Sequence, residues 1–227
     1  MLKIDERMKQ YEKTYNYKLL PKEPVVIRID GKAFHSFTRG CEKPFDMKLI
    51  EAMVSAGEKT AKEMMGFKLG YCQSDEFTFL LSDLDNFESE AWFGNEIQKI
   101  ASVSASLFTA FFNKEMGGTI ACFDSRAFNI PLADAPNIFV WRQQDWERNS
   151  LQMLSRSHFS HKQLIGKGRA EMNEMLFSIG DNWAELPDVL KNGTFITKTE
   201  RINKKLNYAE INNYINNKEK TNIYGRC

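Results

Sequence analysis

Cysteines are scarce in this sequence, and long apolar runs are absent. The four cysteines, Cys41, Cys72, Cys122 and Cys227, form no CxxC pair and no Cys/His ladder. This argues against a zinc module and favours reduced thiols in a cytoplasmic protein. No apolar stretch approaches the roughly 20 residues of a membrane span, so no membrane partner is expected. The segment MLKIDERMKQYEK is charged and lacks the apolar core of a signal peptide.

An overall excess of positive charge is also missing, because the formal net charge is only +1. Global basicity therefore gives no indication of nucleic-acid binding. The charges are nevertheless unevenly spread: seven acids and no Lys or Arg lie between Lys68 and Lys99, whereas residues 191–227 hold eight Lys or Arg and three acids. This polarity is compatible with an acidic, metal-collecting face and a phosphate-binding arm. For the tail alone, a solvated Asn-rich surface explains the composition equally simply.

What the sequence does contain is enough apolar material for a core: 42% hydrophobic residues, with 17 Phe and 10 Met. A charged helix is predicted over residues 3–17. Alternating apolar residues predict strands over 24–30, 67–73 and 76–81, and a fourth strand is expected over 119–130, before Pro131. Helical spacing predicts a helix after Pro44, with Asp46 as its N-cap, and a second helix from about Ser89 to Asn113.

The order β-α-β-β-α-β predicts an α+β, ferredoxin-like fold: an antiparallel sheet with two helices on one face and an open face for a ligand. We interpret residues 1–135 as a palm-like domain with an N-terminal helix. Residues 136–227 are expected to form a mostly helical extension with a late strand at 194–199 and a basic tail, packed on the same compact unit.

Three carboxylates are expected to meet at one edge of this sheet. In the ferredoxin-like order the first strand is central and pairs with the third, so Asp30, which ends the first strand, comes near Asp75 and Glu76 in the following hairpin turn. Unpaired, these acids would repel and would be costly to bury. Mg²⁺ favours one or two carboxylates together with phosphate oxygens and water, and two such ions suit in-line attack on phosphorus.

Taken singly, Asp30–Gly31 and Ser74–Asp75 could be ordinary turn signals. Their matched positions in the β-α-β-β-α-β pattern favour the metal hypothesis. Two cations support it, because Arg28 shares the face of Asp30, and Lys43 lies just before the first long helix, whose N-terminus also favours phosphate.

Five segments resemble the tRNA-histidine guanylyltransferase superfamily, in order, from about residue 24 to 180. They are RIDGKAFHSF, EKPFD, GYCQSDEFTFLL, FDSRAFNIP and WRQQDWERNS. The resemblance implies a palm-like polymerase domain that extends the 5′ end of RNA, usually tRNA, in the 3′-to-5′ direction. A 5′-monophosphate is activated with ATP or GTP, and the 3′-hydroxyl of an incoming nucleoside triphosphate displaces the activating group.

The resemblance also implies roles for individual residues. Asp30 and Asp75 would be catalytic and, with the Gly31 carbonyl, would hold two Mg²⁺ ions. Glu76 matches the motif acid, but its strand parity favours a structural role. The match gives the nucleotide-binding positions His35, Lys43, Asp46, Ser74 and Lys99. Arg28, indicated above by its place on the strand, is added to them. His35 could equally be a capping or core histidine.

One departure concerns Glu147-Arg148-Asn149-Ser150, where the eukaryotic histidine-tRNA enzymes carry His-Ile-Asn-Asn. That motif belongs to non-templated guanosine addition. Its loss resembles the guanylyltransferase-like branch and favours template-dependent repair of 5′-truncated tRNA; the alternative is addition of the extra 5′ guanosine to histidine tRNA. A nucleotidyl cyclase and a non-catalytic RNA-binding module are less favoured rivals.

Two further expectations concern partners. The basic tail is predicted to contact tRNA phosphates through Lys198, Arg201, Lys204 and Lys205. The family analogy implies a homo-oligomer, in particular a tetramer.

Overall fold

The computed structural model describes residues 2–86 and 88–216. The first part of the chain contains α1 (Ile4–Lys13), β1 (Val25–Gly31), α2 (Phe34–Phe37), α3 (Met47–Lys62), β2 (Phe67–Gln73), β3 (Glu76–Leu81), α4 (Ile97–Met116) and β4 (Phe123–Asn129). The extension contains α5 (Ala135–His158), α6 (His161–Leu164), α7 (Arg169–Ser178), α8 (Asp188–Asn192), β5 (Thr194–Ile196), β6 (Arg201–Ile202) and α9 (Tyr208–Asn216).

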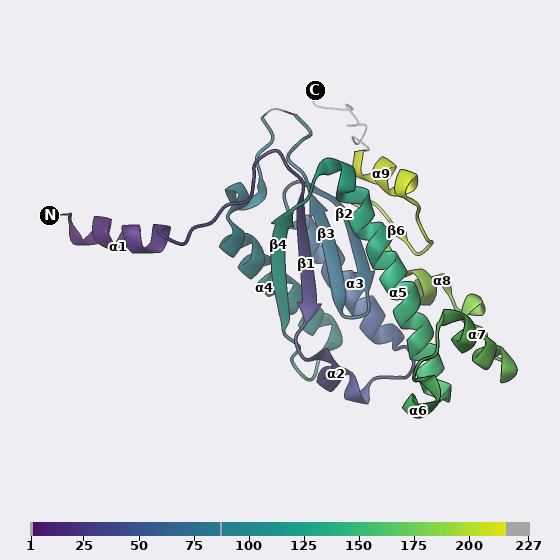
Figure 1. Cartoon of the computed structure of the whole chain (residues 1–227). Helices are drawn as coiled ribbons and strands as arrows, with labels where there is room; N and C mark the ends of the chain where they lie inside the picture. The colour runs from purple at the N-terminus through teal and green to yellow at the C-terminus, as the bar shows by residue number, and fades with distance from the viewer. Residues whose placement is uncertain (1, 87, 217–227) are drawn as a thin grey trace, which may run out of the picture.

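The strands form one sheet in the order β4-β1-β3-β2-β5-β6 (Figure 1). The central pairing of β1 with β3, predicted from the sequence, is present, and both β1 neighbours are antiparallel to it. The α+β class and the ferredoxin-like order of the first four strands are therefore confirmed. The extension contributes β5 and β6 to the same sheet, so strands from before and after residue 135 are hydrogen-bonded into one sheet.

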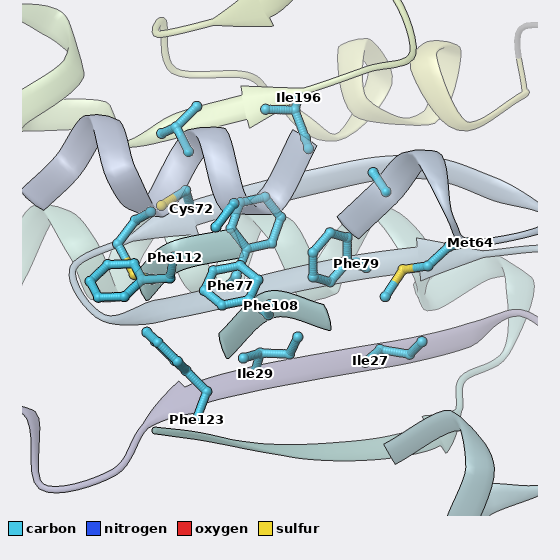
Figure 2. Close-up of a cluster of buried hydrophobic side chains, with 14 of the residues drawn as sticks. Ile27, Ile29, Met64, Cys72, Phe77, Phe79, Phe108, Phe112, Phe123 and Ile196 are labelled. Carbon is cyan, nitrogen blue, oxygen red and sulfur yellow. The ribbon is translucent and has the colours of Figure 1, made fainter. Parts of the chain in front are cut away.

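One face of the sheet packs on α3 and α4. Odd-numbered β1 residues such as Ile27 and Ile29 point into this core, together with Phe77, Phe79 and Phe108 (Figure 2). The rings of Phe77 and Phe79 stack with centroids 4.3 Å apart. Because successive side chains of a strand alternate between faces, Arg28 and Asp30 point to the other side.

The second face is not open, which corrects the expectation of a free ligand-binding surface. The extension covers it: Val26 and Leu80 pack with Phe139 of α5 and Ile211 of α9 in a second buried cluster. The side chain of Gln143 both donates to and accepts from the Leu206 backbone, at 2.9 and 2.8 Å, and so fixes the chain before α9 against α5. Apolar even-numbered strand residues need such a cover.

The second long helix begins later than predicted. Phe93, Gly94 and Asn95 have φ angles of 50°, 54° and 62°, and right-handed helix cannot propagate through left-handed residues. The segment Trp92–Asn95 therefore forms a short 3-10 turn, and α4 starts only at Ile97 and continues to Met116.

The first helix also differs, since α1 ends at Lys13, and none of its residues is buried. It projects away from the body of the molecule (Figure 1). Within the described ranges, no helix is both long enough and apolar enough to cross a membrane.

Candidate active site

The carboxylates predicted to converge do lie together. Asp30 is directly opposite Glu76 in the β1–β3 register, and Asp75 occupies the turn between β2 and β3. The Gly31 amide donates a hydrogen bond of 3.1 Å to the Asp75 carbonyl, which ties the end of β1 to this turn. Ser74, with φ 48°, supplies the left-handed step that closes the turn. The strand ends thus hold Asp30, Gly31 and Asp75 in one place.

The electrostatics of this place suit a cation. Burial raises the pKa of the Asp75 carboxyl, and the negative charge of Asp30 raises it further. A cation beside both groups would relieve this cost. Among residues 2–86 and 88–216, no cluster of three or more His, Cys, Asp or Glu side chains could hold a metal. Two carboxylates and the Gly31 carbonyl would leave the other ligand positions to water and substrate phosphates, which is the way Mg²⁺ is usually held.

Glu76 belongs to a different arrangement. Its carboxylate lies 2.7 Å from Arg142 Nε and 3.9 Å from Arg28 Nε. Arg142 also pairs with Asp145, at 2.9 Å. Burial raises the pKa of the Glu76 carboxyl, whereas the two guanidinium groups lower it. Glu76 thus connects β3 to α5, as its strand parity suggested, and Arg28 contacts this carboxylate rather than the nearby cavity.

That cavity, of about 280 Å³, opens beside Asp75 between the segment after α2 and the middle of α5. Sequence-predicted residues make up a large part of its lining, namely His35, Lys43, Asp46, Ser74 and Asp75. Apolar walls come from Phe45 and Trp146, whose rings meet edge to face with centroids 6.5 Å apart. A cavity with apolar walls, one convergent cation and carboxylates at its edge has the character of a ligand site.

The predicted nucleotide-binding residues differ in their exposure and in the hydrogen bonds that they already make within the chain. Lys43 is exposed, and its ammonium group donates to the Thr38 carbonyl at 3.2 Å. His35 is exposed, with its ring nitrogen 3.1 Å from Ser36 Oγ. Asp46 is already used by the backbone: it accepts hydrogen bonds from the Leu49 amide at 3.0 Å and the Glu42 amide at 3.1 Å.

These bonds make Asp46 the N-cap of α3, as predicted. The Leu49 amide lowers the pKa of the Asp46 carboxyl most, and the Glu42 amide adds to the effect.

Lys99, which the family resemblance matched to another basic nucleotide-binding position, does not lie beside Asp30 and Asp75. It lies in the first turn of α4 and pairs with Glu96 at 3.2 Å. That end of α4 is bonded to Tyr17, whereas the other end is bonded through Asn113 to Ala121, just before the strand that pairs with Gly31. A 20-residue helix is about 30 Å long, so most of this length separates Lys99 from Asp30.

The predicted RNA-binding residues of the tail are largely engaged within the chain. Arg201 pairs with Glu58 at 2.6 Å and with Glu51 at 2.8 Å, and so connects β6 to α3. Lys204 pairs with Glu210 at 3.4 Å, and Lys205 with Glu147. Lys198 lies between β5 and β6. The rest of the basic tail, residues 217–227, lies outside the described residues, and contact of the tail with RNA stays a prediction.

Sequence reasoning missed the wall that α5 contributes. Trp146 is buried and Met153 lies seven residues further along the same helix, so both can face one cavity. Cys41 was also missed as a site residue; burial raises the pKa of its thiol, and Asp46 adds to the effect. The helical spacing of Trp146 and Met153 was visible in the sequence, but nothing local indicated which element they would face. The described cysteines, Cys41, Cys72 and Cys122, are free thiols.

Replacing Lys43 by alanine is expected to weaken nucleoside-triphosphate binding about tenfold or more, because a hydrogen bond to a charged group contributes roughly 1.5–3 kcal/mol. Isothermal titration with GTP would measure this. Lys48→Ala is the matched control: Lys48 is also exposed, bonds a backbone carbonyl at 3.0 Å, and does not line the cavity. Equal GTP affinities for the two variants would make Lys43 an ordinary surface lysine.

Comparison with known proteins identifies the family of this chain. Residues 5–131 match the family described as tRNAHis guanylyltransferase. The tRNA(His) guanylyltransferase of Schizosaccharomyces pombe is 32% identical over 210 residues, which cover 83% of this chain and 78% of that protein.

Two solved structures are also similar. A bacterial tRNA(His) guanylyltransferase (Thg1)-like protein in complex with ATP superposes with a TM-score of 0.90 at 40% identity, covering 94% of this chain and 97% of that one. The tRNA(His) guanylyltransferase from Saccharomyces cerevisiae gives 0.78 at 26% identity, covering 90% and 97%.

Proposed function

The chain belongs to the tRNA(His) guanylyltransferase family, whose members are nucleotidyltransferases, and on this premise we propose that it adds nucleotides to the 5′ end of tRNA with the help of Mg²⁺. The observation that carries the proposal is a cavity lined by both Asp75 and Lys43, next to the end of β1, where Asp30 lies opposite Glu76. Structures of a bacterial relative described as complexes with ATP and with GTP support a triphosphate as the ligand.

In this proposal the site residues have three different roles. Asp30, the Gly31 carbonyl and Asp75 hold Mg²⁺, and two ions match the arrangement used for in-line displacement at phosphorus. Bound there, the metal would neutralise phosphate charge and favour ionisation of the attacking hydroxyl. Lys43 neutralises the outer phosphates as a point charge, and the rings of Phe45 and Trp146 shield the cavity from water.

Two substrates are compatible with this site. Guanosine addition to histidine tRNA, the alternative in the sequence analysis, is the better supported, because the relatives carry that activity in their names. Template-dependent repair is favoured by one observation: two residues at the positions of the motif for non-templated guanosine addition are used in packing within the chain. Glu147 and Ser150 are buried: Glu147 pairs with Arg169 and Lys205, and Ser150 accepts a hydrogen bond from Trp183 at 2.9 Å. These two residues thus serve helix packing.

A panel of tRNAs that differ only in the base opposite the added nucleotide separates the two candidates. Addition of guanosine to histidine tRNA, whatever base lies opposite, is the expected result. Addition of A, C, G or U according to the opposing base, on any 5′-truncated tRNA, would establish the repair enzyme instead. In that case Watson–Crick pairing selects the nucleotide, because a mispaired base leaves hydrogen-bonding groups unmatched. A cyclic product from nucleotide alone would contradict both.

The tetramer and the cytoplasmic location expected from the sequence remain part of the proposal. The exposed α1, with Ile4 at 70% and Tyr11 at 64% exposure, offers an apolar surface that a second copy could cover.

A further inference from the structure

A second charged surface lies beside the cavity and has no role in the site described above. Residues 149–170, which run from the second half of α5 through α6 to the start of α7, contain four Lys or Arg and two of the three His of the chain, but no Asp or Glu. Such a long stretch without acids stands out in a chain whose Lys and Arg, 31 in number, nearly equal its 30 acids.

Some of these side chains have a carboxylate partner within the chain. Arg169 pairs with Glu147 at 3.2 Å, Lys167 with Glu171 at 2.7 Å, and His158 lies 2.7 Å from Asp181.

Three others, Arg156, His161 and Lys162, are exposed and have no carboxylate partner in the described part of the chain. The partner of Arg156 is the neutral Gln152 amide, at 3.4 Å. Arg156 is in the last turn of α5, where a cation offsets the helix dipole. That reason does not extend to His161 and Lys162, which lie beyond the end of α5.

The position of these side chains relates them to the cavity. Met153 lines the cavity, and Arg156 lies three residues further along α5, so the two side chains are neighbours on the helix surface, about 4.5 Å apart along its axis. Arg156 and His161 also line a small cleft of about 100 Å³ with Lys167. The cavity and the cleft are thus adjacent along one helix.

Cations flank the cavity on its other side as well. Lys32, Arg39 and Lys43 come from the chain around α2; they too are exposed and lack a carboxylate partner within the described residues. Figure 1 shows α2 and α6 at the same end of the molecule. An acidic centre with cations on both sides suits a polyanion that places one end at the carboxylates and extends its backbone across the flanks.

We propose that Arg156, His161 and Lys162 form a docking surface for the phosphate backbone of the tRNA whose 5′ end enters the cavity. This inference rests on the proposed function and locates RNA binding on α5 and α6, in addition to the tail predicted from the sequence. The contacts are to phosphates, because flexible exposed cations at a helix end neutralise charge without reading bases.

The test measures tRNA binding by filter retention from 50 to 200 mM KCl, without nucleotide or divalent cation. The variant is Arg156→Gln with Lys162→Gln. Its control, Lys62→Gln with Lys99→Gln, removes the same charge from the far ends of α3 and α4. The first variant should lose on the order of tenfold in affinity, and the slope of log affinity against log salt should fall by about 2, since each phosphate contact contributes about 0.9. The control should keep the wild-type slope.

An unchanged slope in the first variant, or an equal fall in the control, would overturn the docking surface. Thermal unfolding of both variants checks that the fold is intact. Failure of the proposed function is a separate result: the wild type would then bind tRNA with the same salt slope but would add no nucleotide to it.

Discussion

Nucleotide addition is expected to fall by at least about a thousandfold when Asp75 is replaced by asparagine, and equally when Asp30 is. Each change removes a charged metal ligand from the reacting centre, and loss of such a ligand costs several kcal/mol of transition-state stabilisation. The measurement is single-turnover addition of labelled GTP to tRNA at saturating Mg²⁺.

Asp75→Asn should also change thermal stability, and in the direction opposite to its effect on activity. Because burial and Asp30 raise the pKa of the Asp75 carboxyl, the ionised form is less favourable in the folded than in the unfolded protein. Above the unfolded-state pKa this lowers stability, and neutral asparagine removes the penalty. Asp75→Asn should therefore unfold at a higher temperature than wild type in the presence of a chelator, although it is inactive.

Asp124→Asn is the control for both measurements. Asp124 lies opposite Asp30 on β4, is exposed, and pairs with Arg126 at 3.3 Å. It should retain activity and melt close to wild type. An Asp75→Asn variant that turns over normally in Mg²⁺ would remove the metal assignment altogether.

The largest effect on stability is expected from Arg142→Met. Arg142 is buried and is the closest partner of Glu76, so its loss leaves this largely buried carboxylate with only the longer, 3.9 Å contact to Arg28. Breaking a buried pair from one side costs about 3–5 kcal/mol. Urea unfolding would measure this change in the free energy of unfolding.

Two further variants identify the cause. Arg148→Met removes a guanidinium from the same helix that also pairs with Asp145, but Arg148 is exposed. It should cost no more than about 1 kcal/mol. The double variant Arg142→Met with Glu76→Gln should recover much of the loss, because no buried charge is then left alone. Additive losses in the double variant would show that Arg142 acts through packing rather than through Glu76.

The elements that could be predicted are those with a local pattern. Alternation in PVVIRID and EFTFLL, and helical spacing after Asp46, led to β1, β3 and α3 with nearly correct limits. The motif residues Asp30 and Asp75 followed from the strand order, because the order determines which strand ends are adjacent. Pairing of β1 with β3 then needed no knowledge of side-chain contacts.

The sequence could not show what covers the second face of the sheet. Phe139 and Val26 are far apart in the chain but lie in one buried cluster, and the apolar periodicity of α5 does not indicate which element the helix packs against. For the same reason the charges of the tail appeared free. Arg201 meets Glu58 only because β5 and β6 extend the sheet toward α3.

By itself, then, the sequence determined the order of strands and helices, the family resemblance and the carboxylates at the strand ends, because each depends on residues close together or on a known order. Tertiary structure alone decided which charges remain available. Glu76, Arg201 and Lys205 are occupied by distant partners, whereas Arg156 and Lys162 are left exposed to solvent. Ion pairing depends on distance in space, and sequence spacing limits that distance only within a single helix or strand.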